Sequence, residues 1–104
     1  MELTLLTVPA CPNAALFGER LAVALASQPD MVVRRRQISD EREAAEAGMR
    51  GSPTLLIDGV DPFGAPGQQP SLSCRLYRDP TGHADGAPPL DALQEVLEQA
   101  SAHR

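Results

Sequence analysis

Cys11 is the residue of this chain best suited to chemistry. It stands in the segment VPACPNA (residues 8–14), between a strand-like run and the start of an apolar helical pattern. The unpaired backbone N–H groups and the helix dipole at such a junction favour a thiolate, the form of cysteine that attacks disulfides and binds soft metals. Pro12 suits the first position of a helix, where its missing N–H costs nothing. The sequence therefore predicts a reactive thiol, although a free cysteine is also a common small core residue.

The elements that must position Cys11 alternate between strands and helices. Apolar runs and their spacing predict strands over residues 2–8, 31–38, 54–58 and 72–77, and helices over 13–27 and 90–100. A short helix is predicted after Asp40, which has capping-box spacing to Glu43, and Gly48 can end that helix in the left-handed conformation. The prolines and glycines of residues 59–70 predict a long loop.

The resulting order is β-α-β-α-β-β-α. Strand–helix–strand crossovers give parallel neighbours with right-handed connections, and the last two strands can pair antiparallel across the loop. We therefore expect an α/β fold in one domain over residues 1–104, with a four-stranded mixed sheet and helices on both faces. A chain of 104 residues fits one such domain with a modest core.

Charge and hydropathy narrow the classes of partner. The formal net charge of −5 argues against nucleic acid, whose binding needs a basic face. The one basic run, residues 34–36, fits an edge strand whose charges block pairing between sheets. No apolar stretch is long enough to span a bilayer, and no signal peptide is visible. We expect a cytoplasmic protein with reduced thiols and neither nucleic acid nor membrane as partner; the oligomeric state is open.

A second motif, RGSPTLLIDG (residues 50–59), places Pro53 directly before the third predicted strand. Together with Cys11-Pro12 at the first strand–helix junction and the element order, it resembles the thioredoxin superfamily over residues 2 to about 99. In that family this proline is cis and lies against the reactive cysteine. The resemblance thus implies a cis Pro53 facing Cys11, with the backbone N–H and C=O of Ser52 open to a docked peptide or thiol. The substrate site it implies consists of Pro12, Asn13, Ser52, Pro53 and Thr54.

Two departures from the family pattern change the expected chemistry. The usual motif is Cys-x-x-Cys, but Ala14 stands in the fourth position, and Pro9-Ala10 replaces the aromatic residue that precedes the motif. The resemblance therefore implies a single-cysteine redox protein in which Cys11 attacks a mixed disulfide. A low-molecular-weight thiol, as co-substrate, or Cys74 would then release the product. The substrate is a protein or a small thiol or disulfide, and no other cofactor is expected.

Cys74 is the only other cysteine. It shares strand phase with Leu72 and Leu76, which predicts a side chain that faces the core. Antiparallel pairing with the third strand would place it on the order of 10 Å from the Cys11 edge, whereas a disulfide needs Cα atoms within about 7 Å. We expect buried packing for Cys74 rather than the role of resolving thiol, unless the long preceding loop shifts the strand.

Two other functions remain open. The first is a redox-inactive binding module that presents the Cys11 edge or the 59–70 loop to a protein. The second is soft-metal or organomercurial binding by a thiolate, because some similar short proteins are labelled alkylmercury-lyase-like. That chemistry needs a second thiol and a proton donor, which Asn13, Asp61 and Cys74 do not clearly supply.

The remaining polar residues carry weaker signals. No close pair of histidines or cysteines is present, so no metal site is expected. Asp58, Asp61 and Asp79 are predicted to be turn residues. Phe63 has two possible roles, anchoring its loop on the domain or forming a partner surface.

Overall fold

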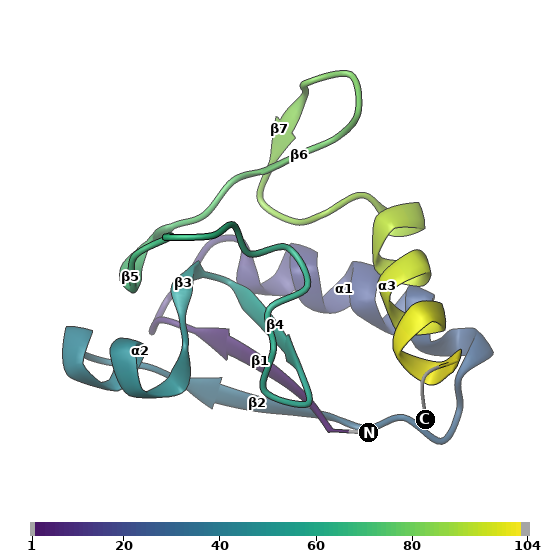
Figure 1. The fold of residues 1–104 in the computed structure, drawn as a ribbon, viewed down its shortest axis with the longest axis horizontal. Coiled ribbons are helices and arrows are strands. Elements are labelled where there is room, and N and C mark those ends of the chain that lie inside the picture. The colour runs from purple at the N-terminus through teal and green to yellow at the C-terminus, as the bar shows by residue number, and fades with distance from the viewer. Residues whose placement is uncertain (1, 103–104) are drawn as a thin grey trace.

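The computed structural model describes residues 2–102 and is an α/β structure (Figure 1). Its elements in chain order are β1 (Leu3–Thr7), α1 (Ala14–Ala24), the 3₁₀ turn η1 (Leu25–Ser27), β2 (Val33–Gln37), α2 (Glu41–Ala47), β3 (Arg50–Ser52), β4 (Thr54–Ile57), β5 (Ser71–Cys74), β6 (Tyr77–Arg78), β7 (Ala84–Asp85) and α3 (Leu90–Ala102). None of the helices within the described residues is long and apolar enough to cross a membrane.

The central sheet has the strand order β2-β1-β4. β1 pairs parallel with β2 and antiparallel with β4, so that Leu5 lies between Arg35 and Leu55. The α1 crossover between β1 and β2 makes their parallel pairing possible. β2 lies at the edge of this sheet, and the basic run of residues 34–36 is exposed on it. This arrangement confirms the predicted edge position of the three arginines.

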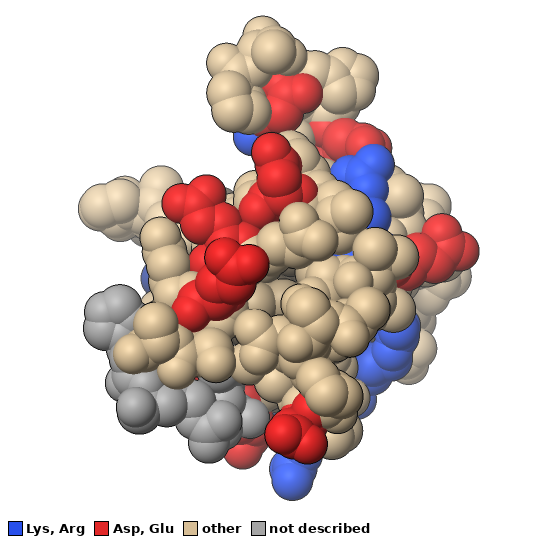
Figure 2. Space-filling view, turned by 90° about the vertical axis from the view of Figure 1, so that its right-hand side faces the viewer, with Lys and Arg blue, Asp and Glu red and all other residues tan. Residues whose placement is uncertain are grey.

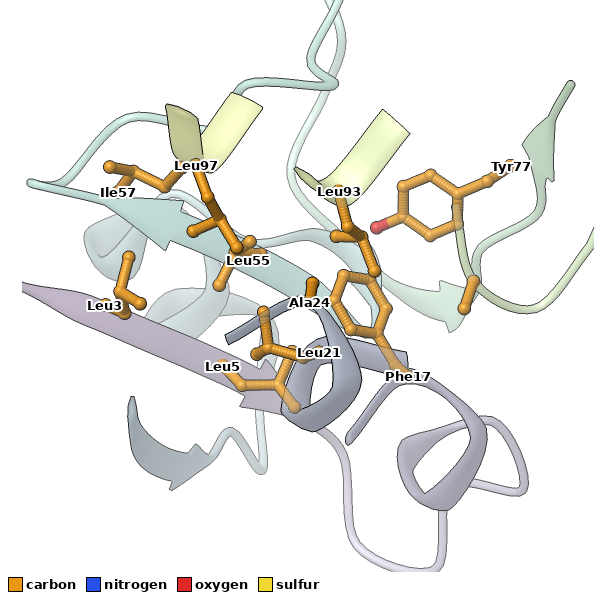
Figure 3. Close-up of a cluster of buried hydrophobic side chains, with 11 residues drawn as sticks. Leu3, Leu5, Phe17, Leu21, Ala24, Leu55, Ile57, Tyr77, Leu93 and Leu97 are labelled. Carbon is orange, nitrogen blue, oxygen red and sulfur yellow. The ribbon is translucent and has the colours of Figure 1, made fainter. Parts of the chain in front are cut away.

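Side chains along β1 and β4 point alternately to the two faces of the sheet and pack in two separate hydrophobic cores, one on each face. Leu5 and Leu55 belong to the larger core, where they pack with residues of α1 and α3. Figure 3 shows the leucines of the sheet facing Phe17 and Leu21 of α1. Leu6 and Leu56 belong to the smaller core, whose other buried members are Ile38, Ala44 and Met49, on α2 and beside it. Helices therefore cover both faces of the sheet, as the sequence predicts.

The ends of α2 follow the predicted capping chemistry. The N–H of Glu43 donates to the side chain of Asp40 at 2.8 Å, and the N–H of Ser39 donates to the Glu43 carboxylate at 3.4 Å. At the other end Gly48 is left-handed, with φ +82°, and its N–H donates to Ala44. These bonds satisfy backbone groups that a helix leaves unpaired at its two ends.

The predicted four-stranded sheet is not found in residues 2–102. The segment expected as the fourth strand is divided into β5 and β6, and β5 pairs parallel with β3 rather than antiparallel with β4. β6 pairs with β7 in a hairpin that projects from the body of the molecule (Figure 1). The reason lies in the path of the 59–70 loop, which returns the chain to the start of β3 before β5 begins.

A bulge in β5 reverses which of its side chains face inward. Arg50 pairs with Ser71 and Ser52 pairs with Cys74, so β5 has one more residue than β3 between these two pairs. An extra residue shifts the alternation of side chains by one position. Cys74 is consequently exposed, and Arg75 and Tyr77 are buried. The prediction that Cys74 packs in the core is therefore wrong.

Candidate functional site

Cys11 lies in the connection between β1 and α1. Its N–H donates to the carbonyl of Val8 at 3.3 Å, closing a turn, and its own carbonyl accepts from the N–H of Ala14 at 3.3 Å. Ala10, directly before it, has φ +58°, a left-handed conformation that residues other than glycine rarely adopt. Such backbone strain often occurs at functional sites. Cys11 is half-buried between the exposed residues Ala10 and Pro12, so solvent reaches the turn.

The start of α1 differs from the prediction. Pro12 lies in the turn before the helix rather than at its first position, and Asn13 is the N-cap. The Asn13 side chain makes no capping hydrogen bond. It lies instead against Gly86, where a Cβ atom would overlap the Asn13 amide group. Asn13 therefore connects the Cys11 turn to the segment that leads into α3.

An ion pair reinforces this connection. Arg20 of α1 donates to the carboxylate of Asp85 at 2.7 Å and to the carbonyls of Ala87 and Pro88. The hydrogen bond from Arg20 holds the pKa of Asp85 below its usual range. The β6–β7 hairpin and the segment that leads into α3 are thus attached to the helix that follows Cys11.

The Ser52–Pro53 peptide bond is cis, as the resemblance predicts. The Ser52 hydroxyl oxygen accepts a hydrogen bond of 3.1 Å from the backbone N–H of Val8. Because Val8 begins the turn that holds Cys11, this bond joins the Cys11 turn to the cis-proline segment. Two segments far apart in the sequence thereby meet at one end of the central sheet.

The structure corrects the role expected for Ser52. Its carbonyl accepts from the N–H of Arg75 at 3.0 Å, and Cys74 lies opposite it in the β3–β5 ladder. Ser52 is completely buried. The carbonyl that the resemblance leaves open to a docked peptide is therefore occupied by the chain's own β5.

Pro53 and Thr54 are also engaged from within the protein. The Tyr77 hydroxyl donates to the carbonyl of Pro53, and the Thr54 hydroxyl donates to the carbonyl of Gly51 at 2.6 Å. Both residues are buried. Of the expected substrate-site residues, Pro12 is exposed and Asn13 half-buried, whereas Ser52, Pro53 and Thr54 are buried.

Comparisons of this chain with protein-family models, with curated proteins and with solved structures find no match. Its function must therefore be inferred from the site itself.

A buried ion pair holds β5 and the 59–70 loop in place. The Arg75 guanidinium donates to the Asp61 carboxylate at 2.7 Å and to the carbonyl of Phe63 at 2.9 Å. The side chains of Asp61 and Arg75 are 1% and 7% exposed. Asp61 was predicted to be a turn residue, and its sequence context gives no signal of burial.

Tyr77 connects this ion pair to the main core. Its ring lies 4.6 Å below the Arg75 guanidinium carbon and makes edge-to-face contacts of 5.7 Å with Phe17 and Phe63. Figure 3 shows the Tyr77 ring beside Leu93 and Phe17. The contact with Tyr77 shows that Phe63 packs its loop against the domain, which is the first of the two roles left open by the sequence. Burial raises the pKa of Tyr77 far above its usual value, because an apolar environment disfavours the phenolate.

Tyr77 predicts an alkaline limit to stability. The folded state keeps the Tyr77 phenol neutral. The stabilisation that this gives the folded state is therefore complete below the unfolded-state pKa of about 10, and it is lost as pH rises above that value. We expect the free energy of unfolding to fall by up to about 1.4 kcal/mol per pH unit there. Urea unfolding at a series of alkaline pH values measures this slope.

The composition makes the measurement specific. Tyr77 is the only tyrosine, and all nine basic residues are arginines, so no lysine titrates in the same range. Tyrosinate absorbance should therefore appear only with unfolding. A Tyr77→Phe chain should lack the additional slope, and an unchanged slope in that chain would contradict the assignment.

One groove of the described structure lies apart from Cys11. It has a volume of about 670 Å³ and is bounded by the 59–70 loop, β6 and the first turns of α3, with Tyr77 and Phe63 among its walls. Asp79, Asp91 and Glu95 lie on its borders. Figure 2 shows acidic side chains gathered over the face that carries α3. Neither cysteine lines this groove.

Asp79 and Asp58 make hydrogen bonds that support the nearby backbone. The Asp79 carboxylate accepts from Thr81 and His83 and organises the turn of the hairpin, as predicted. Asp58 accepts from the N–H of Glu2 at 2.7 Å. Within residues 2–102, no group of three or more His, Cys, Asp or Glu side chains is placed to hold a metal ion.

Proposed function

We propose that this protein is a thioredoxin-like thiol–disulfide exchange protein with Cys11 as its nucleophile. The observation that carries the proposal is the hydrogen bond between Val8 and Ser52, which joins the Cys11 turn to the cis-proline segment. The β1-α1-β2 crossover, the antiparallel β4 and a final helix across the sheet agree with that fold. The β3–β5 pairing is the departure from it.

The proposed reaction is an exchange of sulfur bonds. The Cys11 thiolate attacks one sulfur of a disulfide R–S–S–R′, forms the mixed disulfide Cys11–S–S–R and releases R′–S⁻. A second thiolate then attacks the mixed disulfide, takes the R–S group and returns Cys11 as thiolate. A low-molecular-weight thiol can supply this second thiolate in a reducing compartment such as the cytoplasm.

The occupied β3 edge favours a small disulfide over an extended protein strand as the substrate. A substrate strand needs free backbone groups to pair with, but the Ser52 carbonyl already accepts from Arg75. Access to Cys11 remains from the side of Ala10 and Pro12, which are exposed. A small molecule can approach the sulfur there without displacing β5.

Two chains with a single thiol each test the proposal. In a Cys74→Ser chain every reaction belongs to Cys11, and in a Cys11→Ser chain every reaction belongs to Cys74. We expect Cys11 to react with a small aromatic disulfide faster than the exposed Cys74, on the order of tenfold at neutral pH. Release of the coloured aromatic thiolate measures both rates.

Equal rates in the two chains, or a slower reaction at Cys11, would contradict the proposal. Such a result would favour the alternative of a redox-inactive binding module, in which Cys11 is an ordinary thiol at the edge of a protein surface. Alkylation with iodoacetamide provides a check that does not depend on disulfide chemistry, and it should rank the two thiols in the same order.

A further inference from the structure

We propose that Cys74 is the resolving thiol for Cys11. In this step the Cys74 thiolate attacks the mixed disulfide on Cys11, and the two residues form an intramolecular disulfide. The inference rests on the proposed function, because Cys11 must first form the mixed disulfide. It gives the protein a second redox residue in place of the one that Ala14 cannot provide.

The direction of β5 is the first observation in favour. Because β5 runs parallel to β3, its last residue lies at the end where β3 meets the cis proline. This is also the end where β1 finishes and the Cys11 turn begins, since Leu6 pairs with Thr54. Figure 1 places β5 and the β1–α1 connection at the same end of the molecule. An antiparallel strand would have carried Cys74 away from it.

Three direct contacts, through Val8 and Ser52, connect the two cysteine segments. Cys11 and Val8 are the ends of one hydrogen-bonded turn, in which Cα atoms lie within about 7 Å. Val8 donates to the side chain of Ser52, and Ser52 lies opposite Cys74 in adjacent strands, which are spaced about 4.8 Å apart. Ser52 is thus the shared neighbour of both cysteine segments.

Exposure and anchoring form the second observation. The bulge turns Cys74 to the surface, so its side chain is not packed in the core. The next residue, Arg75, is fixed in the interior by its ion pair with Asp61. The backbone of Cys74 is therefore held beside Ser52 while its side chain remains accessible. The Cys11 turn, half-buried and bounded by exposed residues, supplies the other thiol.

The step is balanced in atoms and electrons. The sulfur–sulfur bond of Cys11–S–S–R breaks, a new bond forms between the sulfurs of Cys11 and Cys74, and R–S⁻ leaves. Over these two steps a substrate disulfide gains two electrons and becomes two thiols, while the protein dithiol loses two electrons and becomes a disulfide. Two molecules of a small thiol then reduce the Cys11–Cys74 disulfide and complete turnover.

A single-turnover experiment tests the inference. The reduced full-length chain, at low protein concentration, receives one equivalent of a small aromatic disulfide. We expect release of both aromatic thiolates and a monomeric protein lighter by two hydrogen atoms. Peptide mapping without reductant should join Cys11 to Cys74. The Cys74→Ser chain should release one thiolate and keep the other aromatic group on Cys11.

A displaced thiol gives the matched control. Ser71→Cys combined with Cys74→Ser keeps a cysteine on β5 but moves it roughly 10 Å along the strand, opposite Arg50. This chain should behave like the Cys74→Ser chain. Resolution as fast as in the wild type would overturn the inference, because the position opposite Ser52 would then be irrelevant.

Three further outcomes separate this inference from the proposed function. A mixed disulfide that persists on Cys11 of the wild-type chain, or a covalent dimer in place of the internal disulfide, overturns the role of Cys74 and leaves Cys11 exchange standing. Failure of Cys11 to react at all overturns the proposed function itself.

Discussion

An Asp61→Asn chain is expected to lose about 3–5 kcal/mol of unfolding free energy, because the change leaves the Arg75 guanidinium buried without its counter-charge. The two groups are 2.7 Å apart and nearly inaccessible to solvent. Asparagine keeps an oxygen that can accept from the N–H of Phe63, as Asp61 does at 2.9 Å. The loss therefore reports the missing charge rather than the missing turn. Urea unfolding at neutral pH measures it.

An exposed ion pair provides the control for this effect. Arg42 and Glu46 on α2 form an i,i+4 pair at 3.2 Å whose side chains are 88% and 62% exposed. Glu46→Gln should cost no more than about 0.5 kcal/mol. Arg75→Met in the Asp61→Asn background should recover part of the larger loss by removing the unpaired charge. Equal effects of the two carboxylate changes would show that burial of Asp61 contributes nothing.

The features that depend on nearby residues in the chain, or on a visible sequence motif, could be predicted from the sequence. Asp40 and Gly48 delimit α2 through bonds within a few residues of themselves. The apolar run of β1 follows from its central position between β2 and β4. The cis bond before Pro53 came from the resemblance rather than from propensity, since proline alone is mostly trans. Each of these features depends on residues that are close together in the chain or on a motif that is visible in it.

The placement of β5 could not be predicted in this way. Its partner is chosen by the course of the 59–70 loop, whose anchor Asp61 becomes buried only when Arg75 folds onto it. The alternation of Leu72, Cys74 and Leu76 predicts a regular strand, but the bulge after Ser71 shifts the inward positions to Arg75 and Tyr77. The position of the second cysteine, on which the proposed chemistry depends, was therefore fixed by long-range contacts.

Gly51 is the second position where one substitution should have a large effect. Its φ is +113°, and a Cβ atom there would lie 2.9 Å from the Cβ of Arg75 and 3.2 Å from the carbonyl oxygen of Ser73. Gly51→Ala therefore combines backbone strain with a clash against β5, neither of which a flexible side chain can relieve. We expect a loss of about 2–5 kcal/mol in unfolding free energy, from strain and overpacking together.

Gly59→Ala separates the two causes. Gly59 also has a positive φ, +82°, but no atom lies within 4 Å of the Cβ position. This change should cost only the conformational part, on the order of 1 kcal/mol. Because Gly51 contacts β5 and Gly59 does not, only Gly51→Ala should also speed hydrogen exchange at the Arg75 amide, which bonds to Ser52. Similar losses in both chains, with the Arg75 amide still protected, would mean that the contact between Gly51 and β5 adds nothing to the cost of the methyl group.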